Sequence, residues 1–361
     1  MAVHDIVTGS NGEKFLDGVT KFDWPDDTAA ANMFSWTGQE ATGPNTQLAA
    51  ETAEASGKFL GTHDNELLSL PGGRLGDVNP HLTEAFAQGL APYVNNIAGT
   101  HGAVGGEFFQ RLDNPTDIDN GRMPVAKGVF SVLSSDPTAS DIFNGAALRE
   151  SVLAEGRYAQ DYRSFVPGLD SYQSPLHDAA TLQALSNVGI HNATDATDWN
   201  DARKEAMSFE QERRAFQTGV AALGAVPGVG PGFEVLGAAS ESAIIGDPMS
   251  GSWGDDQNPI PQMDNAYASR QILDSLVGSG VLVNNLPREH YTPIDPGNPS
   301  GPQRIRTFEE MQDVDQYLPD GDYKATLDRA LDTTIGTDFS NAAAGSMSER
   351  YNKIIDDLDP T

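Results

Sequence analysis

The sequence contains no cysteine. Disulfide bonds, thiolate zinc sites and cysteine nucleophiles are therefore excluded. The seven histidines are scattered, and no two of them stand in an HxH or HExxH pattern. A G-x-S-x-G nucleophile elbow and a Walker A loop are also missing. We therefore expect no cofactor, no metal centre and no catalytic residue that belongs to a known short motif.

Positively charged residues are also scarce in the sequence. The 361 residues include 22 Lys and Arg against 52 Asp and Glu, which gives a formal net charge of −30. No segment gathers Lys and Arg into the kind of basic patch that contacts nucleic-acid phosphates or anionic lipids. This composition excludes nucleic acid as an expected partner, and it leaves protein partners as the expectation.

Long apolar runs are absent as well. No stretch of eighteen apolar residues occurs, so we expect no stable membrane span. Residues 1–16 contain Asp5, Glu13 and Lys14 and lack the apolar region of a secretory signal peptide. We expect a protein that is either cytoplasmic or exported by a route that reads no cleaved N-terminal signal, and a piece of a longer chain also fits.

Helix signals are abundant. Asn79 precedes Pro80, which places a capping residue before a proline at the first helical position. The apolar residues that follow recur at helical spacing, and Pro92 is expected to interrupt that helix. The pairs 136–137 and 174–175 repeat the cap-and-proline pattern, and the second of these helices is expected to stop at Gly189. Residues 195–220 show apolar positions at alternating steps of three and four, which predicts one long helix.

Residues 219–246 consist mostly of Gly, Ala and other apolar residues around a Pro- and Gly-rich turn. Small residues let helices approach closely, so this segment predicts a tight helical hairpin in the core. A membrane-inserting or interaction hairpin is the functional alternative, although each arm is short of the roughly 20 residues that cross hydrocarbon. Its candidate residues are Val220, Leu223, Val226, Pro227, Gly228, Val229, Gly230, Phe233 and Leu236.

The remaining sequence predicts loops over 247–265 and 286–307 and helices over 266–282, 308–317, 323–335 and 346–358. Alternating apolar and polar runs between hairpin turns are missing, so few or no strands are expected. The predicted fold is all-α: an irregular helical bundle with long Pro- and Gly-rich loops. We expect an N-terminal helical hairpin over 1–75, a helical core over 76–246 and a loop-rich helical portion over 247–361.

One short motif suggests export, whereas the acidic residues give no clear sign of a calcium site or of catalysis. Trp36 and Gly38 form a WxG triplet between helical patches at 26–36 and 46–60, where type VII secretion substrates place a turn. Acidic residues are frequent near Gly121 and Gly321, but their spacing does not fit an EF-hand and favours solvated turns. A pair of catalytic carboxylates distant in sequence would leave no signature among 52 acidic residues.

Several phrases of the sequence resemble one family when they are taken in order. They are Phe22-Asp-Trp24, the Ala-rich patch before Trp36, the stretches 79–86 and 90–99, and the shorter stretches 188–192, 227–231 and 245–248. Together they resemble actinobacterial, chiefly mycobacterial, proteins described as containing a "TPR repeat region" and often encoded near type VII secretion genes. No 34-residue period is visible, so periodicity gives that description no support.

The resemblance implies a mostly helical, secretion-associated protein with no catalytic residues to transfer. Our first hypothesis is therefore a non-enzymatic exported or cell-envelope interaction protein linked to type VII secretion. Its partners would be the secretion machinery or WxG-type proteins, and it would leave the cytoplasm by a non-Sec route. The alternatives are a cell-wall-directed hydrolase with paired carboxylates and a membrane-inserting, toxin-associated module that uses the 219–246 segment.

Overall fold

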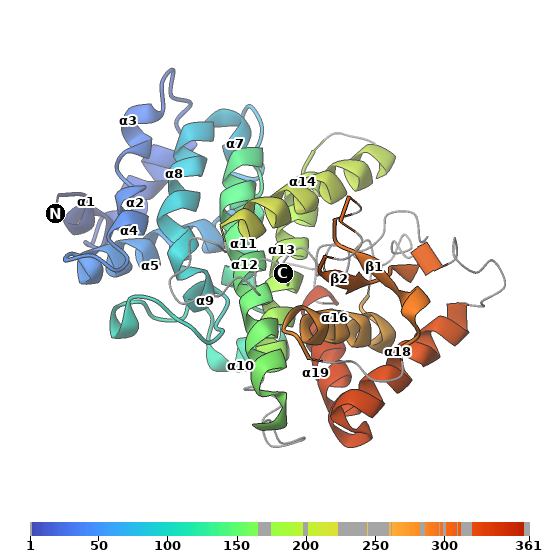
Figure 1. The fold of residues 1–361 in the computed structure, drawn as a ribbon. Helices are drawn as coiled ribbons and strands as arrows, with labels where there is room; N and C mark the ends of the chain where they lie inside the picture. Colours follow the sequence, from blue (N-terminus) through green and yellow to red (C-terminus); the bar gives the residue numbers. More distant parts are fainter. Residues whose placement is uncertain are drawn as a thin grey trace. The chain divides into compact units, whose positions relative to one another are not determined.

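The computed structural model describes residues 2–164, 175–197, 201–222, 244, 260, 262–281, 286–295, 297–298, 301–308, 310–311 and 320–356. These residues are mostly helical, as the sequence predicts, and Figure 1 shows helices in both units together with one small sheet. The chain forms two compact units. Unit 1 comprises residues 1–148, 184–219 and 353–361, and unit 2 comprises 149–183 and 220–352.

Each unit consists of more than one stretch of the chain. The boundaries between the stretches fall within two long helices, α12 (Pro137–Asp161) and α13 (Pro175–Asp195), so each of these helices contributes residues to both units. Asp136 caps the first of these helices, since its carboxylate accepts a hydrogen bond of 2.8 Å from the Ala139 N–H. The three domain ranges expected from the sequence stay a prediction.

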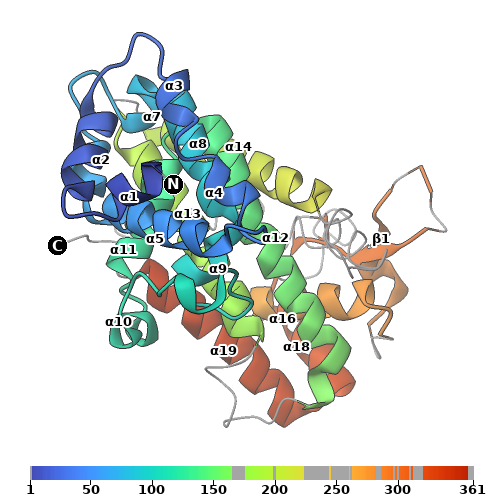
Figure 2. The same ribbon diagram turned by 90° about the vertical axis from the view of Figure 1, so that its left-hand side faces the viewer.

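Unit 1 begins with short helices and continues into longer ones (Figures 1 and 2). In chain order they are α1 (Ala2–Val7), α2 (Gly12–Lys21), α3 (Thr28–Ala31), α4 (Trp36–Gln39), α5 (Thr46–Thr62), α6 (Asp64–Leu67), α7 (Leu75–Val78), α8 (Pro80–Leu90), α9 (Val94–Ile97), α10 (Pro115–Asn120), α11 (Pro124–Leu133) and α14 (Asp201–Ala221). Short 3-10 turns lie at Ala91–Tyr93 and Gly106–Phe108. Pro92 lies in the first of these turns, which separates α8 from α9 as expected.

Close helix packing builds the core of unit 1. Helices α5 and α11 pack closely at Gly61 and Gly128, because a Cβ atom on Gly61 would lie 2.1 Å from the Val125 carbonyl oxygen and one on Gly128 would lie 2.4 Å from the Gly61 carbonyl oxygen. Helix α8 packs on α3 and α4, and the buried rings of Phe34 and Phe86 contact each other at 4.3 Å between their centroids, with their planes tilted by 37°. These contacts fix α8, which in turn positions the loop described below.

Two helix boundaries differ from the sequence expectation. Gly189 does not end its helix, since α13 continues to Asp195. A Cβ atom at this position would lie 2.6 to 2.8 Å from atoms of Phe130, so the glycine allows close packing in mid-helix instead. The long helix expected over 195–220 begins later, because residue 195 still belongs to α13 and α14 begins at Asp201.

Unit 2 contains the helices α16 (Asn265–Gly278), α18 (Asp320–Ile335) and α19 (Thr337–Ile355), the 3-10 turns Tyr162–Ser164 and Arg288–His290, and most of α12. Strands β1 (Tyr291–Pro293) and β2 (Gln303–Ile305) pair antiparallel, with Tyr291 opposite Ile305. The sequence predicts only loop over 286–307, so this small sheet is a correction. Helix α16 packs on α18 and on β2, and these contacts form the core of the unit.

Candidate functional site

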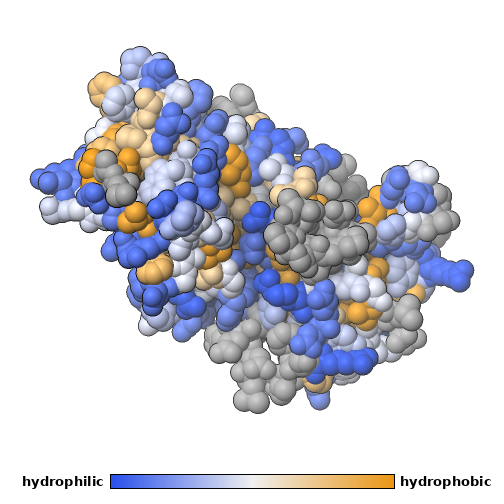
Figure 3. All heavy atoms as spheres, turned by 60° about the vertical axis from the view of Figure 1, so that its left-hand side comes forward, coloured by the Kyte–Doolittle hydropathy of each residue, from blue (hydrophilic) through white to orange (hydrophobic). Residues whose placement is uncertain are grey.

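Exposed aromatic side chains gather near the N-terminus. Four large hydrophobic side chains of the described residues are exposed, and three of them lie within the first 36 residues: Ile6 (45%), Phe22 (55%) and Trp24 (36%). The fourth is Met207 on α14. Phe22 and Trp24 belong to residues 22–27, the connection between α2 and α3, which we name the aromatic loop. Figure 2 shows α2 and α3 near the edge of unit 1, and Figure 3 shows hydrophobic patches among hydrophilic surface on that side.

The two rings of the aromatic loop contact each other edge to face. Their centroids are 4.7 Å apart and their planes meet at 64°. The indole Nε1–H of Trp24 donates a hydrogen bond of 2.8 Å to the Val19 carbonyl oxygen on α2. The indole therefore has a fixed orientation although a third of its surface is exposed, and such a rigid aromatic group loses little conformational entropy on binding.

A buried amide holds the loop in place. Asn79 has no exposed surface, and its Nδ2 donates to the carbonyl oxygens of Thr20 (3.1 Å) and Phe22 (2.8 Å). Its Oδ1 accepts a hydrogen bond of 3.3 Å from the Trp24 N–H. One side chain thus satisfies three backbone groups on and beside the aromatic loop, and the Asn79 amide itself is fully buried and has all of these bonds inside the protein.

This arrangement corrects one detail of the sequence analysis. Helix α8 begins at Pro80, as predicted, but the Asn79 side chain makes no capping hydrogen bond. The carboxylate of Asp27, at the end of the aromatic loop, does so instead: it accepts from the Leu82 N–H at 3.0 Å and contacts His81 Nδ1 at 2.7 Å. The loop caps the helix while the residue before the helix holds the loop, so each contact stabilises the other.

Electrostatics at the loop are dominated by carboxylates. The hydrogen bond to Asp27 raises the pKa of His81, and the hydrogen bonds that Asp26 accepts from Thr28 lower the pKa of that carboxyl. Lys21 is the cation that precedes the loop, and its ammonium is paired with the carboxylates of Asp17 and Glu66. The exposed Asp23 lies between the two aromatic residues. Carboxylates therefore outnumber cationic groups on and beside the aromatic loop.

The structure places the two residues of the WxG triplet in α4. Trp36 is the first residue of this short helix, and its Nε1 donates to the Met33 carbonyl oxygen at 2.9 Å. Gly38 packs against α8, where a Cβ atom would lie 2.1 Å from the Gln88 carbonyl oxygen. The helical patch expected over 26–36 consists instead of α3, a turn and the start of α4. A role of Trp36 and Gly38 in secretion stays a prediction.

The candidate hairpin can be placed only at its start. Val220 lies half-buried in the last turn of α14, one residue after Gly219. The other candidate residues, from Leu223 to Leu236, lie outside the described residues. No helix in the described part of the chain is both long and apolar enough to cross a membrane.

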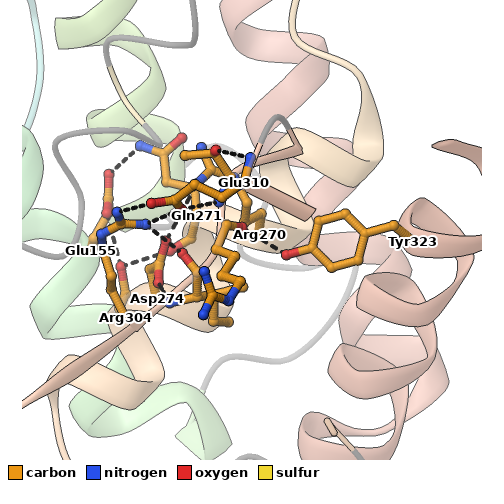
Figure 4. A network of polar contacts seen from close by, with 11 residues as sticks. Glu155, Arg270, Gln271, Asp274, Arg304, Glu310 and Tyr323 are labelled. Atoms are coloured by element: carbon orange, nitrogen blue, oxygen red, sulfur yellow. Dashed lines mark hydrogen bonds and ion pairs between the residues drawn. The ribbon is translucent and has the colours of Figure 1, made fainter. Parts of the chain in front are cut away.

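A second polar cluster lies inside unit 2 (Figure 4). Glu155 on α12 is completely buried, and its carboxylate accepts hydrogen bonds from Gln183 Nε2 (2.9 Å), Gln271 Nε2 (2.7 Å) and Ser275 Oγ (2.8 Å). Burial raises the pKa of Glu155 to about 7, because the ionised form loses its hydration and the three donors compensate only in part.

Helix α16 adds a buried ion pair to the same cluster. Asp274 is completely buried, accepts from the Ile305 N–H of β2 at 2.7 Å, and lies 4.0 Å from Arg270 Nη1. Burial raises the pKa of Asp274 to about 7.

Further polar contacts lie next to this ion pair. Arg304 forms a two-pronged ion pair with Glu310 at 2.6 and 2.7 Å, and the Tyr323 hydroxyl donates to the Arg306 carbonyl oxygen at 2.7 Å. We refer to Glu155, Gln183, Arg270, Gln271, Asp274 and Ser275 as the buried network.

The buried network is the place where the hydrolase alternative can be examined. A general acid and base must reach a substrate. Glu155 and Asp274 have no exposed surface, and Glu155 is occupied by three donors of its own unit. In this conformation a glycan chain has no access to either carboxylate. Among the described residues, no group of three or more His, Asp and Glu side chains is arranged to hold a metal ion.

Comparison with known proteins bears on the N-terminal helices. Residues 1–36 match the family described as TPR repeat domain. The matched stretch covers α1, α2, the aromatic loop and α3. It supports a TPR-containing protein and, because TPR units bind other proteins through their helical surfaces, a role in protein interaction. No curated protein and no solved structure matches the chain.

The match also revises one conclusion drawn from the sequence. The lack of a 34-residue period left the TPR description without support there, but a match of 36 residues is about one repeat long and needs no period. The aromatic loop itself escaped the sequence analysis as a site. The only signal in the sequence is the run Phe22-Asp-Trp24-Pro-Asp-Asp27, which mixes aromatic and acidic side chains; the structure adds that residues 21–26 are all exposed.

Proposed function

We propose that this protein is a non-enzymatic interaction protein that binds a protein partner through the aromatic loop. The observation that carries the proposal is the exposed pair Phe22 and Trp24, held rigid by the buried Asn79 within the TPR-matched stretch. Exposed, preorganised aromatic residues are typical of the residues that dominate binding energy at protein interfaces.

The finer part of the proposal concerns where the protein acts. We propose that it is exported, or carried to the cell envelope, by a type VII secretion route, with the secretion machinery or WxG-type proteins as partners. The resemblance of residues 22–24, 79–86 and 90–99 to secretion-associated proteins supports this, as does the WxG triplet at Trp36 and Gly38. A cytoplasmic interaction protein is the alternative location.

Site-specific photocrosslinking in a host with a type VII system tests the partner. A photoreactive phenylalanine replaces Phe22 in one variant and Met207 in the other, because both side chains are exposed but only the first lies in the aromatic loop. We expect a discrete adduct with one protein from position 22 and none from position 207. Equal adducts at both positions, or none at position 22, contradict the proposed binding surface.

The same host tests the location. The chain is followed in cells, envelope and medium of a secretion-competent strain and of a strain whose secretion ATPase is inactive. We expect export only in the competent strain. A purely cytoplasmic chain in both strains contradicts the export proposal and leaves the interaction proposal standing.

A further inference from the structure

The charges around the aromatic loop indicate what kind of partner it fits. Residues 1–36 contain six carboxylates and two lysines. One of the lysines, Lys21, lies beside the loop, but its charge is neutralised by two carboxylates, Asp17 and Glu66. Asp23 and Asp26 are exposed on the loop itself. A ligand that approaches the rings therefore meets an excess of negative charge.

Aromatic faces carry negative electrostatic potential and attract cations, and an arginine side chain can stack on a ring while its N–H groups contact carboxylates. Phe22 and Trp24 meet at 64°, so they present differently oriented aromatic surfaces beside Asp23 and Asp26. We propose that the aromatic loop recognises an arginine side chain on a basic segment of the partner protein. This inference rests on the proposed function, because it names the partner class for the same surface.

The part of the chain that the structure describes offers no cation of its own to these rings. Among the described residues, no lysine or arginine lies over the ring of Phe22 or Trp24. The indole is already oriented by its hydrogen bond to Val19, and the backbone by Asn79. A cationic side chain can therefore bind without first reordering the loop, which lowers the entropic cost of binding.

A second copy of the chain fits the loop less well. In a symmetric dimer the same patch occupies both sides of the interface, so Asp23 and Asp26 of one copy would face those of the other. Two chains with a formal charge of −30 each also repel at long range. An arginine-bearing segment has complementary charge and offers a group that aromatic rings and carboxylates both bind.

Fluorine NMR of the full chain provides the test. The chain contains four tryptophans, so incorporation of 5-fluorotryptophan gives four signals, and Trp24→Phe identifies the signal of Trp24. The probes are blocked tri-arginine and blocked tri-citrulline, which has nearly the same shape without the charge. We expect the Trp24 signal to shift saturably with tri-arginine, and tri-citrulline to need at least about tenfold higher concentration. The signal of Trp36 serves as the internal reference and stays in place.

Two charge variants sharpen the result. Asp23→Asn removes an exposed carboxylate of the loop that has no hydrogen bond or ion pair within the described part of the chain. It is expected to weaken tri-arginine binding by about threefold to tenfold. Asp119→Asn removes an exposed carboxylate on α10 and changes the net charge equally. This control is expected to bind like the unmodified chain.

Several outcomes overturn the inference. Equal shifts with tri-arginine and tri-citrulline mean that the cation is not recognised. Equal weakening by Asp23→Asn and Asp119→Asn means that a diffuse charge attracts the peptide. A dimer that Phe22→Ala dissociates identifies a second copy as the occupant. If the crosslink at position 22 forms while tri-arginine fails to bind, the proposed function stands and the arginine inference falls.

Discussion

The aromatic loop of unit 1 and the buried network of unit 2 both reverse the usual placement of residues. The loop exposes aromatic rings, whereas the network buries charged groups. In each region, side-chain amides donate the hydrogen bonds that hold the other residues in place. Asn79 fixes the loop, and Gln183 and Gln271 bind Glu155 in the network.

The two regions differ in how completely their polar atoms are satisfied. Asn79 uses its amide nitrogen and its oxygen in three hydrogen bonds. In the network, Asp274 Oδ2 and the Oε1 atoms of Gln183 and Gln271 have no hydrogen-bond partner. A buried polar group without a partner costs free energy, and a buried charge costs more. The network should therefore respond strongly to mutation and pH, while the loop should respond mainly to the loss of its anchor.

The largest effect is expected from breaking the ion pair of the network. Asp274→Ala removes the buried carboxylate that pairs with Arg270 and that accepts the hydrogen bond of the Ile305 N–H. We expect a loss of about 3–5 kcal/mol in the free energy of unfolding at pH 8, measured by urea denaturation. Asp274→Asn keeps an acceptor for Ile305 and should lose clearly less. Equal losses in the two variants would show that the charge of Asp274 is unimportant.

A somewhat smaller effect is expected from pH. Burial raises the pKa of Glu155 from 4.5 to about 7, so between these values the folded chain binds the proton more tightly than the unfolded chain. Stability from this group is therefore greatest below pH 4.5 and falls as the pH rises through 7, by about 3 kcal/mol in total. Glu155→Gln removes this contribution, and the unfolding free energy of the variant should change less between pH 5 and pH 8 than that of the unmodified chain.

One outcome of this experiment would contradict the prediction. If the unmodified chain and Glu155→Gln lose the same stability between pH 5 and pH 8, Glu155 is not the group that titrates. Burial raises the pKa of Asp274 to about 7 and that of Glu212 to about 8, so their carboxyl groups would then account for the fall. An uncharged amide at position 155 is tolerable because the free Oε1 atoms of Gln183 and Gln271 can accept its hydrogen bonds after rotation of their amides.

The sequence was sufficient for features that depend on neighbouring residues. The all-α class, the start of α8 at Pro80 and the interruption at Pro92 follow from local periodicity and proline geometry, and the structure confirms them. The role of the Asn79 side chain could not be read there, because its partners lie 55 to 59 residues away. A cap and a distant anchor require the same residue type, so local sequence does not distinguish them.

The buried network was equally hidden. Arg270 and Asp274 stand four residues apart on α16, a spacing that on a helix usually indicates a solvent-exposed ion pair. Both are buried because α16 packs on α18 and β2, and these elements follow 40 or more and 25 or more residues later in the chain. Glu155 carries no local signal among 52 acidic residues. Burial of a charged group depends on tertiary contacts, which spacing alone does not encode.

The smallest effect on stability, and the most direct test of the loop, comes from Asn79→Ala. This change removes three hydrogen bonds at a fully buried position, so we expect a loss of about 1–3 kcal/mol. Without its anchor the aromatic loop should open, and trypsin should cleave the bond between Lys21 and Phe22 several-fold faster, as mass spectrometry of timed digests would show. Asn114→Ala is the matched control, because Asn114 only caps α10 and holds no loop. An unchanged rate at Lys21 in Asn79→Ala would mean that the rings are oriented by Val19 and Asp27 alone, and the loop would then owe its rigidity to its own two ends.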